Sequence, residues 1–164
     1  MIQSWDTAFK GGPGSFVCGQ VWGVKANKYY LIDQIRDRLT FSQTVQAIQS
    51  LLEKYPNTDE VLIEDAANGP AIMDTLRETV NGLVPVKADG SKTARLSAVT
   101  PLFEAGQVFL PRRSLWLVDY ESEMLQFPFS KNDDQVDATS MALRRLKKVQ
   151  SFSPLRPIRN LVNR

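Results

Sequence analysis

The stretch KNDDQVDA, residues 131–138, is the part of the sequence that says most about the fold. Asp133, Asp134 and Asp137 fall within five residues, at the start of a segment with helical periodicity. Spacings of three and four residues place their side chains on one face of a helix. Carboxylates this close repel one another, and their burial is costly unless a cation lies among them. The residues directly after Asp137 are small, so we expect this helix to pack closely against a sheet.

Two further acidic positions end short apolar segments. Asp6 lies late in the opening segment, and Glu64 and Asp65 follow Val61-Leu62-Ile63, which is typical of a central parallel strand. Ligand sites in an open parallel sheet form at the carboxyl ends of its strands, so these acids are expected to converge. Glu64 and Asp65 point to opposite faces if the strand continues, which favours Glu64 as a ligand and leaves Asp65 as the alternate. Each acid alone could be a helix cap or a polar strand end, but the three positions together favour a metal site.

Composition restricts the chemistry further. A chain of 164 residues with 43% apolar content is expected to form one domain with a substantial core. It has no histidine and one cysteine, Cys18, which excludes Ser-His-Asp catalysis, histidine-ligated zinc and an intrachain disulfide. No apolar run approaches the ~20 residues of a membrane span, and no secretory signal is present, so we expect no membrane association. An oxygen-ligated cation such as Mg²⁺ or Mn²⁺ is the natural partner of such an acidic set.

The order of predicted elements indicates an α/β fold. Three antiparallel strands come first, and helices then alternate with strands, so that a mixed sheet carries helices on both faces. Residues 1–149 are expected to form this domain, and residues 150–164 a basic tail that contains prolines. Strands are predicted at 2–7, 16–25, 29–36, 61–64, 83–87 and 108–110, a turn at 11–14, and helices from Thr40 or Ser42 to 55, from Pro70, from Asp89 or Ser91 to 106, at 115–124 and at 133–149.

Several cations are candidates for contact with a polyanion. Lys92 and Arg95 lie three residues apart at a predicted helix start, where they could bind phosphate, and Lys131 is a further candidate. Residues 144–164 carry cations and no acid, which fits either a nucleic-acid partner or a solvated helix end with a frayed tail. No element is suited to base-edge readout, so little sequence preference is expected, with affinity that falls steeply as salt rises.

Four segments together resemble the C-terminal nuclease domain of the large terminase subunit of tailed double-stranded DNA phages. That domain has a ribonuclease H-like fold, shared with Holliday-junction resolvases and transposases. The resemblance implies that Asp6, Glu64 and Asp137 are the catalytic metal ligands, with Asp134 assisting. It also implies that two divalent cations, Mg²⁺ or Mn²⁺, support hydrolysis of double-stranded DNA during viral genome packaging. The four segments are residues 5–8, residues 63–71, residues 91–95 with 106–111, and residues 127–138.

The resemblance also implies a packaging ATPase domain, a small terminase subunit and a portal as partners, in the host cytoplasm. The sequence has no Gly-x-x-x-x-Gly-Lys-Ser/Thr phosphate loop, so ATP hydrolysis is not assigned to it, and an excised domain, a fragment or a stand-alone relative is expected. Asn132 stands where family members often carry histidine. Two alternatives stay open: another ribonuclease H-like nuclease, such as a resolvase or transposase, and a non-catalytic DNA-binding assembly module.

Overall fold

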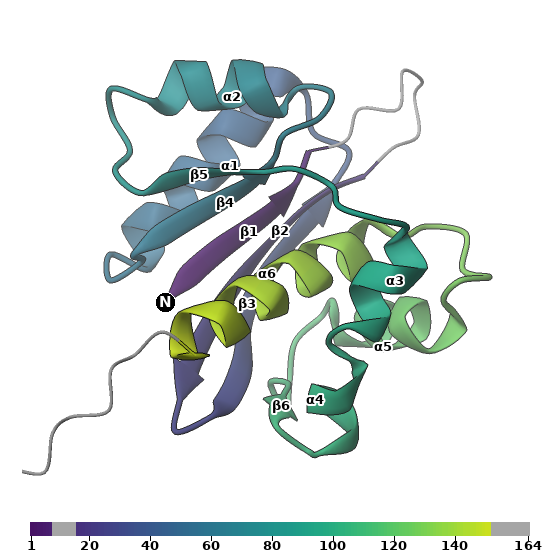
Figure 1. The fold of residues 1–164 in the computed structure, drawn as a ribbon. Coiled ribbons are helices and arrows are strands. Elements are labelled where there is room, and N and C mark those ends of the chain that lie inside the picture. Colours follow the sequence, from purple (N-terminus) through teal and green to yellow (C-terminus); the bar gives the residue numbers. More distant parts are fainter. Residues whose placement is uncertain (8–15, 152–164) are drawn as a thin grey trace, which may run out of the picture.

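The computed structural model describes residues 1–7 and 16–151, with side chains up to residue 149. The predicted turn at 11–14 and the predicted tail from residue 152 onward lie outside the described residues. Six strands form one mixed sheet in the order β5-β4-β1-β2-β3-β6, with helices on both faces, as predicted (Figure 1). The strands are β1 (Ile2–Asp6), β2 (Val17–Lys25), β3 (Lys28–Asp37), β4 (Glu60–Glu64), β5 (Leu83–Val86) and β6 (Val108–Phe109).

The strand register brings the ends of β1 and β4 together. β1 is antiparallel to β2 and parallel to β4, and Trp5 of β1 is paired with Ile63 of β4. The next residue along each strand is acidic, Asp6 on β1 and Glu64 on β4, so both acids lie at the same edge of the sheet. The predicted convergence of these strand ends is therefore confirmed.

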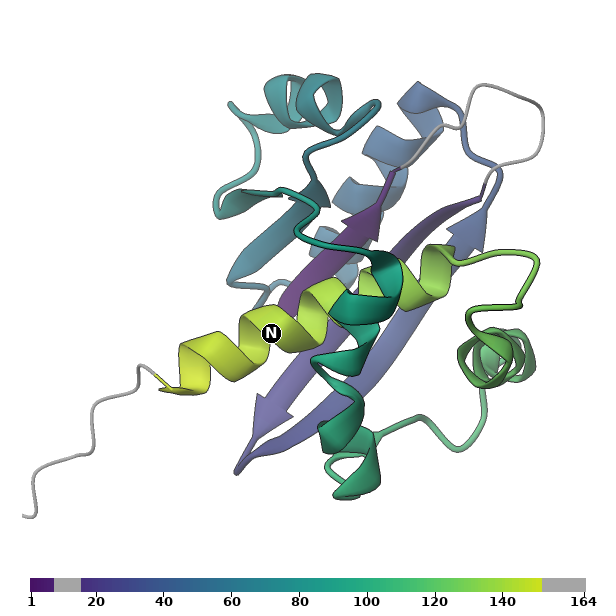
Figure 2. The ribbon, with the colours of Figure 1, turned by 45° about the vertical axis from the view of Figure 1, so that its right-hand side comes forward.

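Helices cover both faces of the sheet, and each face has its own apolar core. α1 (Phe41–Lys54) and α2 (Gly69–Leu76) lie on one face. Figure 2 shows α6 crossing the other face, with α3, α4 and α5 beside it. These four helices are α3 (Lys92–Ser97), α4 (Thr100–Glu104), α5 (Leu117–Gln126) and α6 (Asp134–Ser151). None of the helices in the described part of the chain has the length and apolar character needed to cross a membrane.

α6 packs closely on the sheet because small residues face it. Ala138 and Thr139 are fully buried, and the Ser4 hydroxyl of β1 donates a 2.8 Å hydrogen bond to the Ala138 carbonyl. Side chains two residues apart on a strand share a face, so Asp6 points to the same side of the sheet as Ser4. This contact places the first turn of α6 beside the end of β1. At its other end, α6 continues to Ser151, two residues beyond the end predicted for this helix.

The prediction of a single helix up to residue 106 is wrong, because the chain forms two short helices there. α3 ends at Ser97, and α4 begins at Thr100. Pro101 lacks the N–H that a continuous helix would need at that position, and it disfavours helical geometry at the residue before it. Because of this break, α3 and α4 are separate helices. Ser91 is the N-cap of α3, and its hydroxyl accepts a hydrogen bond from the Ala94 N–H.

Candidate active site

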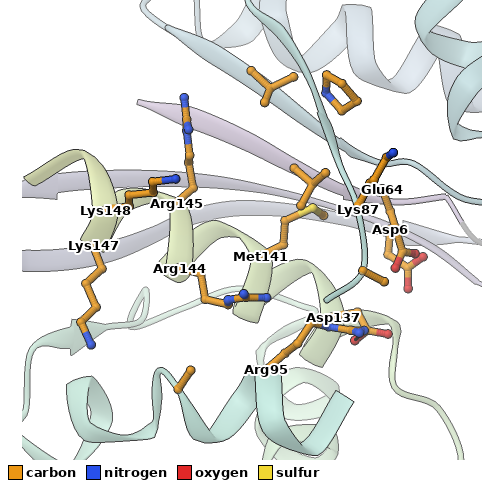
Figure 3. A pocket seen from close by; sticks show the side chains of 15 residues that line it. Asp6, Glu64, Lys87, Arg95, Asp137, Met141, Arg144, Arg145, Lys147 and Lys148 are labelled. Atoms are coloured by element: carbon orange, nitrogen blue, oxygen red, sulfur yellow. Dashed lines mark hydrogen bonds and ion pairs between the residues drawn. The ribbon is translucent and has the colours of Figure 1, made fainter. Parts of the chain in front are cut away.

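Three of the predicted acids line one open cavity of about 570 Å³: Asp6, Glu64 and Asp137. Asp6 comes from the end of β1, Glu64 from the end of β4, and Asp137 from the first turn of α6. Asp6 and Asp137 are only 2% and 5% exposed, so their charges are largely removed from water. Figure 3 shows the side chains of Asp6 and Glu64 close together at one end of the cavity, with Asp137 below them. Side chains from three separated segments are thus gathered at one place.

The position of Glu64 depends on the chain folding back tightly at Gly69. A Cβ atom at Gly69 would lie 1.9 Å from the Glu64 carbonyl oxygen, which no real contact allows. Only glycine therefore permits the start of α2 to lie against the end of β4. The segment IEDAANGPA, singled out in the sequence, owes part of its pattern to this contact.

We expect the Gly69→Ala substitution to lower the free energy of unfolding by about 1–3 kcal/mol, the usual cost of overpacking. The forced shift of the Glu64 backbone should also reduce any DNA cleavage by this domain. Urea denaturation and plasmid cleavage measure the two effects. Gly106→Ala is the control: nothing lies within 4 Å of a Cβ there, and only its positive φ of 64° opposes the change. That control should lose about 1–2 kcal/mol and keep its cleavage rate.

Both carboxylate oxygens of Asp137 are held by cations of α3. The Arg95 guanidinium donates to one oxygen at 2.7 Å, and the Lys92 ammonium contacts the other. Lys92 also pairs with Asp133 at 2.6 Å, and Arg95 donates to the Gly90 carbonyl at 3.1 Å. Although burial by itself would lower it, the bonds to Asp133 and Asp137 hold the pKa of Lys92 above its usual value. Lys92 and Arg95, predicted to contact phosphate, thus face a predicted metal ligand.

Other predicted residues are not gathered at this cavity. Asp65 lines a different hollow, beside Asp74 and Arg77. Lys131 is exposed in the segment before α6. Asp134 receives two hydrogen bonds from Arg36, at 2.6 and 3.0 Å, on the β3 side of α6. The structure therefore gives Asp134 an ion-pair partner in the fold and separates Asp65 from the acids on β1 and α6.

A buried ionic network at the start of α6 was not foreseen from the sequence. One oxygen of Glu123 on α5 accepts the N–H groups of Gln135 and Val136, at 2.8 and 3.2 Å, and so caps the helix from outside. Its other oxygen accepts hydrogen bonds from the Arg36 guanidinium at 3.1 Å and from the Gln135 side-chain amide at 2.8 Å. Burial raises the pKa of Glu123, while these hydrogen bonds favour its charged form. Glu123 is one of three acids in α5, so the sequence alone did not distinguish it from a solvent-exposed carboxylate.

The cavity has a basic wall opposite its acidic end, formed by Arg144, Arg145, Lys147 and Lys148 of α6. Along α6, Asp137, Arg144 and Lys148 fall on one stripe, because they are seven and eleven residues apart. Arg145 forms a bidentate pair with Glu60 at 2.6 and 2.7 Å, whereas Arg144 contacts Asp89 at only 3.5 Å. Along the axis of α6, Arg144 and Lys148 lie about 10 and 16 Å beyond Asp137, and Lys147 and Lys148 are the exposed members of the wall.

The residues present suit a divalent cation by donor type. Asp6, Glu64 and Asp137 contribute carboxylate oxygens, the ligands preferred by Mg²⁺ and Mn²⁺. Within residues 1–7 and 16–151, however, no three acidic, cysteine or histidine side chains lie close enough together to hold one ion. The carboxylate of Asp137 is directed to α3 by its ion pairs with Lys92 and Arg95. A divalent cation at Asp137 would therefore be repelled by two neighbouring positive side chains.

The mixed sheet, its strand order and the acids at the ends of β1 and β4 and in α6 define a protein of the ribonuclease H-like fold. Residues 3–146 match the family model described as the terminase RNaseH-like domain. The chain belongs to this family, as its resemblance to terminase nuclease domains predicted. No curated protein matches the sequence.

Solved structures support the same fold. The large terminase nuclease of the thermophilic phage G20c, with bound zinc, has a TM-score of 0.70 at 21% identity, over 88% of this chain and 80% of that one. The human cytomegalovirus terminase nuclease domain, soaked with manganese and with inhibitor bound, has a TM-score of 0.64 at 16% identity, over 92% and 84%. The large terminase of the thermophilic bacteriophage D6E has a TM-score of 0.69 at 13% identity, over 89% of this chain but 39% of that one.

Proposed function

We propose that this domain is a divalent-metal-dependent endonuclease that cleaves double-stranded DNA during viral genome packaging. The observation that carries the proposal is a single cavity with three carboxylates at one end and a basic wall along α6. A polyanion lying on that wall would present a phosphodiester to the acidic end. Membership of the terminase family, and the zinc, magnesium and manganese named with its structural relatives, support the same activity.

Each charged group of the cavity has a separate task in this proposal. Asp6, Glu64 and Asp137 would hold two divalent cations, Mg²⁺ or Mn²⁺, which when bound supply Lewis-acid stabilisation and lower the pKa of a water nucleophile. The basic wall would neutralise phosphates to one side of the scissile bond and fix their position. Asp134 and Glu123 hold Arg36 and the first turn of α6, and so orient Asp137 without touching DNA.

The decisive experiment incubates the purified chain with supercoiled plasmid, linear duplex and branched DNA, with Mn²⁺, with Mg²⁺ or with EDTA. We expect cleavage of plasmid and linear duplex that requires the divalent ion. Strong preference for branched DNA would instead favour a resolvase-like enzyme. Plasmid that stays intact in every condition while DNA still binds would favour the non-catalytic assembly module.

The wider assembly is also part of the proposal. A packaging ATPase domain, a small terminase subunit and a portal would be the partners, and the host cytoplasm the site of action. The D6E large terminase, of which this chain spans 39%, supports a further domain in the complete machine, and a related D6E structure is described in complex with ADP.

The basic wall predicts how DNA affinity depends on salt. Lys148 is exposed and lines the cavity, so Lys148→Ala should weaken binding equally for unrelated duplex sequences. Loss of one phosphate contact should reduce the slope of log K against log salt by about 0.9. Fluorescence anisotropy over a salt series measures both quantities. Lys25→Ala, which removes an exposed charge at the end of β2, is the control and should leave the slope unchanged. A variant that loses affinity for only one sequence would contradict this contact.

A further inference from the structure

Two cations of α3 contact both oxygens of the Asp137 carboxylate. Arg95 is bonded to Oδ1 at 2.7 Å, and Lys92 contacts Oδ2. The side chains of Arg95 and Asp137 are 10% and 6% exposed, so this pair is shielded from water and from screening by salt. A divalent cation that approaches Asp137 therefore meets two positive side chains at the same two oxygens, and like charges repel.

The two cations have other partners near the cavity to which they can turn. Lys92 is one-third exposed and also pairs with Asp133, while Arg95 also donates to the Gly90 carbonyl. α3 is only six residues long and is separated from α4 by the break at residues 98–99. Arg95 lines the cavity together with Arg144 and Lys148, so a phosphate group on the basic wall would lie within the same enclosure. Phosphate oxygens accept hydrogen bonds from guanidinium and ammonium groups as well as carboxylate oxygens do.

We propose that Lys92 and Arg95 form a cation latch on Asp137, which DNA phosphate opens, so that DNA and divalent metal bind this site cooperatively. The inference rests on the proposed function, since it concerns the regulation of the same site. Without DNA, the latch holds Asp137 away from the metal and keeps the acid charge compensated. With DNA, the two cations move to phosphate and the carboxylate becomes available. Because the coupling is reciprocal, bound metal raises the affinity for DNA by the same factor.

The test measures Mn²⁺ binding rather than cleavage. Free Mn²⁺ is quantified by electron paramagnetic resonance during titration of the whole chain, alone and with a short phosphorothioate duplex, which keeps the backbone charge. The latch variant is Lys92→Met with Arg95→Met, and the matched control is Arg144→Met with Lys148→Met. The control removes two charges from the same cavity without touching Asp137. Thermal unfolding with EDTA and with Mn²⁺ shows whether each variant is folded.

We expect the latch variant to bind Mn²⁺ without DNA about 10-fold more tightly than the parent chain, within the usual range for coupled sites. The duplex should raise the affinity of the parent chain by a similar factor and that of the latch variant much less. In EDTA the latch variant should unfold at a lower temperature than the parent, and Mn²⁺ should restore much of the difference. Without DNA, the control should stay within about twofold of the parent in Mn²⁺ affinity, since it keeps the latch.

Two results would overturn the latch alone. Equal Mn²⁺ affinity of the parent chain and the latch variant would show that the two cations do not compete with the metal. An equal gain in the control would show that only the general positive field matters. If no Mn²⁺ binds to any folded variant, with or without duplex, the proposed function fails first and the latch fails with it. Metal binding with metal-dependent cleavage but no difference among variants would leave the proposed function intact.

Discussion

Asp6→Asn is expected to abolish metal-dependent DNA cleavage, with a loss of about 1,000-fold or more. Asp6 is buried at the end of β1, next to Glu64 in the sheet register, and lines the cavity with Asp137. The amide keeps the shape of the side chain but removes a charged oxygen ligand. Lewis-acid stabilisation contributes several kcal/mol to such reactions, and each 1.4 kcal/mol changes the rate about tenfold. Single-turnover relaxation of supercoiled plasmid with Mn²⁺ measures the loss.

Two comparisons make this prediction specific. Asp65 directly follows Glu64 but lines a different hollow. We therefore expect the Asp65→Asn variant to cleave DNA within about twofold of the rate of the parent chain. A large loss there instead would restore Asp65 as the ligand. Asp6→Asn should remain folded, because the amide has nearly the same size and shape as the carboxylate that it replaces. Cleavage by Asp6→Asn at the parent rate would refute the site assignment.

Arg36→Met is expected to destabilise the fold by about 3–5 kcal/mol, the usual cost of removing one partner of a buried ion pair. Arg36 contacts Glu123 at 3.1 Å and Asp134 at 2.6 Å, and all three side chains are at most 13% exposed. The long apolar side chain of methionine keeps much of the packing but leaves two carboxylates without their cation. Since Glu123 also caps α6, the substitution should loosen the first turn of the helix that carries Asp137. Urea denaturation followed by circular dichroism measures the change.

The control for Arg36 is an ion pair of similar length on the surface. Arg77 contacts Asp74 at 2.7 Å, but both side chains are more than two-thirds exposed. Arg77→Met should therefore cost less than about 1 kcal/mol. Adding Glu123→Gln to Arg36→Met should recover part of the lost stability, because one uncompensated charge is removed while most hydrogen bonds to the α6 N-terminus remain. If Arg36→Met unfolds at the same urea concentration as Arg77→Met, the buried network does not stabilise the fold.

Much of the fold could be predicted from local sequence, because each element has its own pattern of apolar residues and breakers. Thr40 forms the capping box of α1 with Gln43, Pro70 lies in the first turn of α2, and Gly106 ends the segment of α4 with a positive φ. The convergence of Asp6 and Glu64 followed from the rule that parallel strands end at one edge. The break between α3 and α4 was missed because the apolar spacing across it stays helical, whereas Pro101 interrupts the hydrogen bonds.

The sheet, most of the helices and the three strand or helix ends that carry acids follow from local sequence, because they depend on periodicity and on neighbours in the chain. The partner of each charged side chain, by contrast, depends on how distant segments pack together. Asp134 and Asp137 are three residues apart, yet the first is paired with Arg36 of β3 and the second with Lys92 and Arg95 of α3. Ion pairing depends on distance in space and on burial, whereas the spacing of residues along a helix determines only the face of the helix on which each charged residue lies.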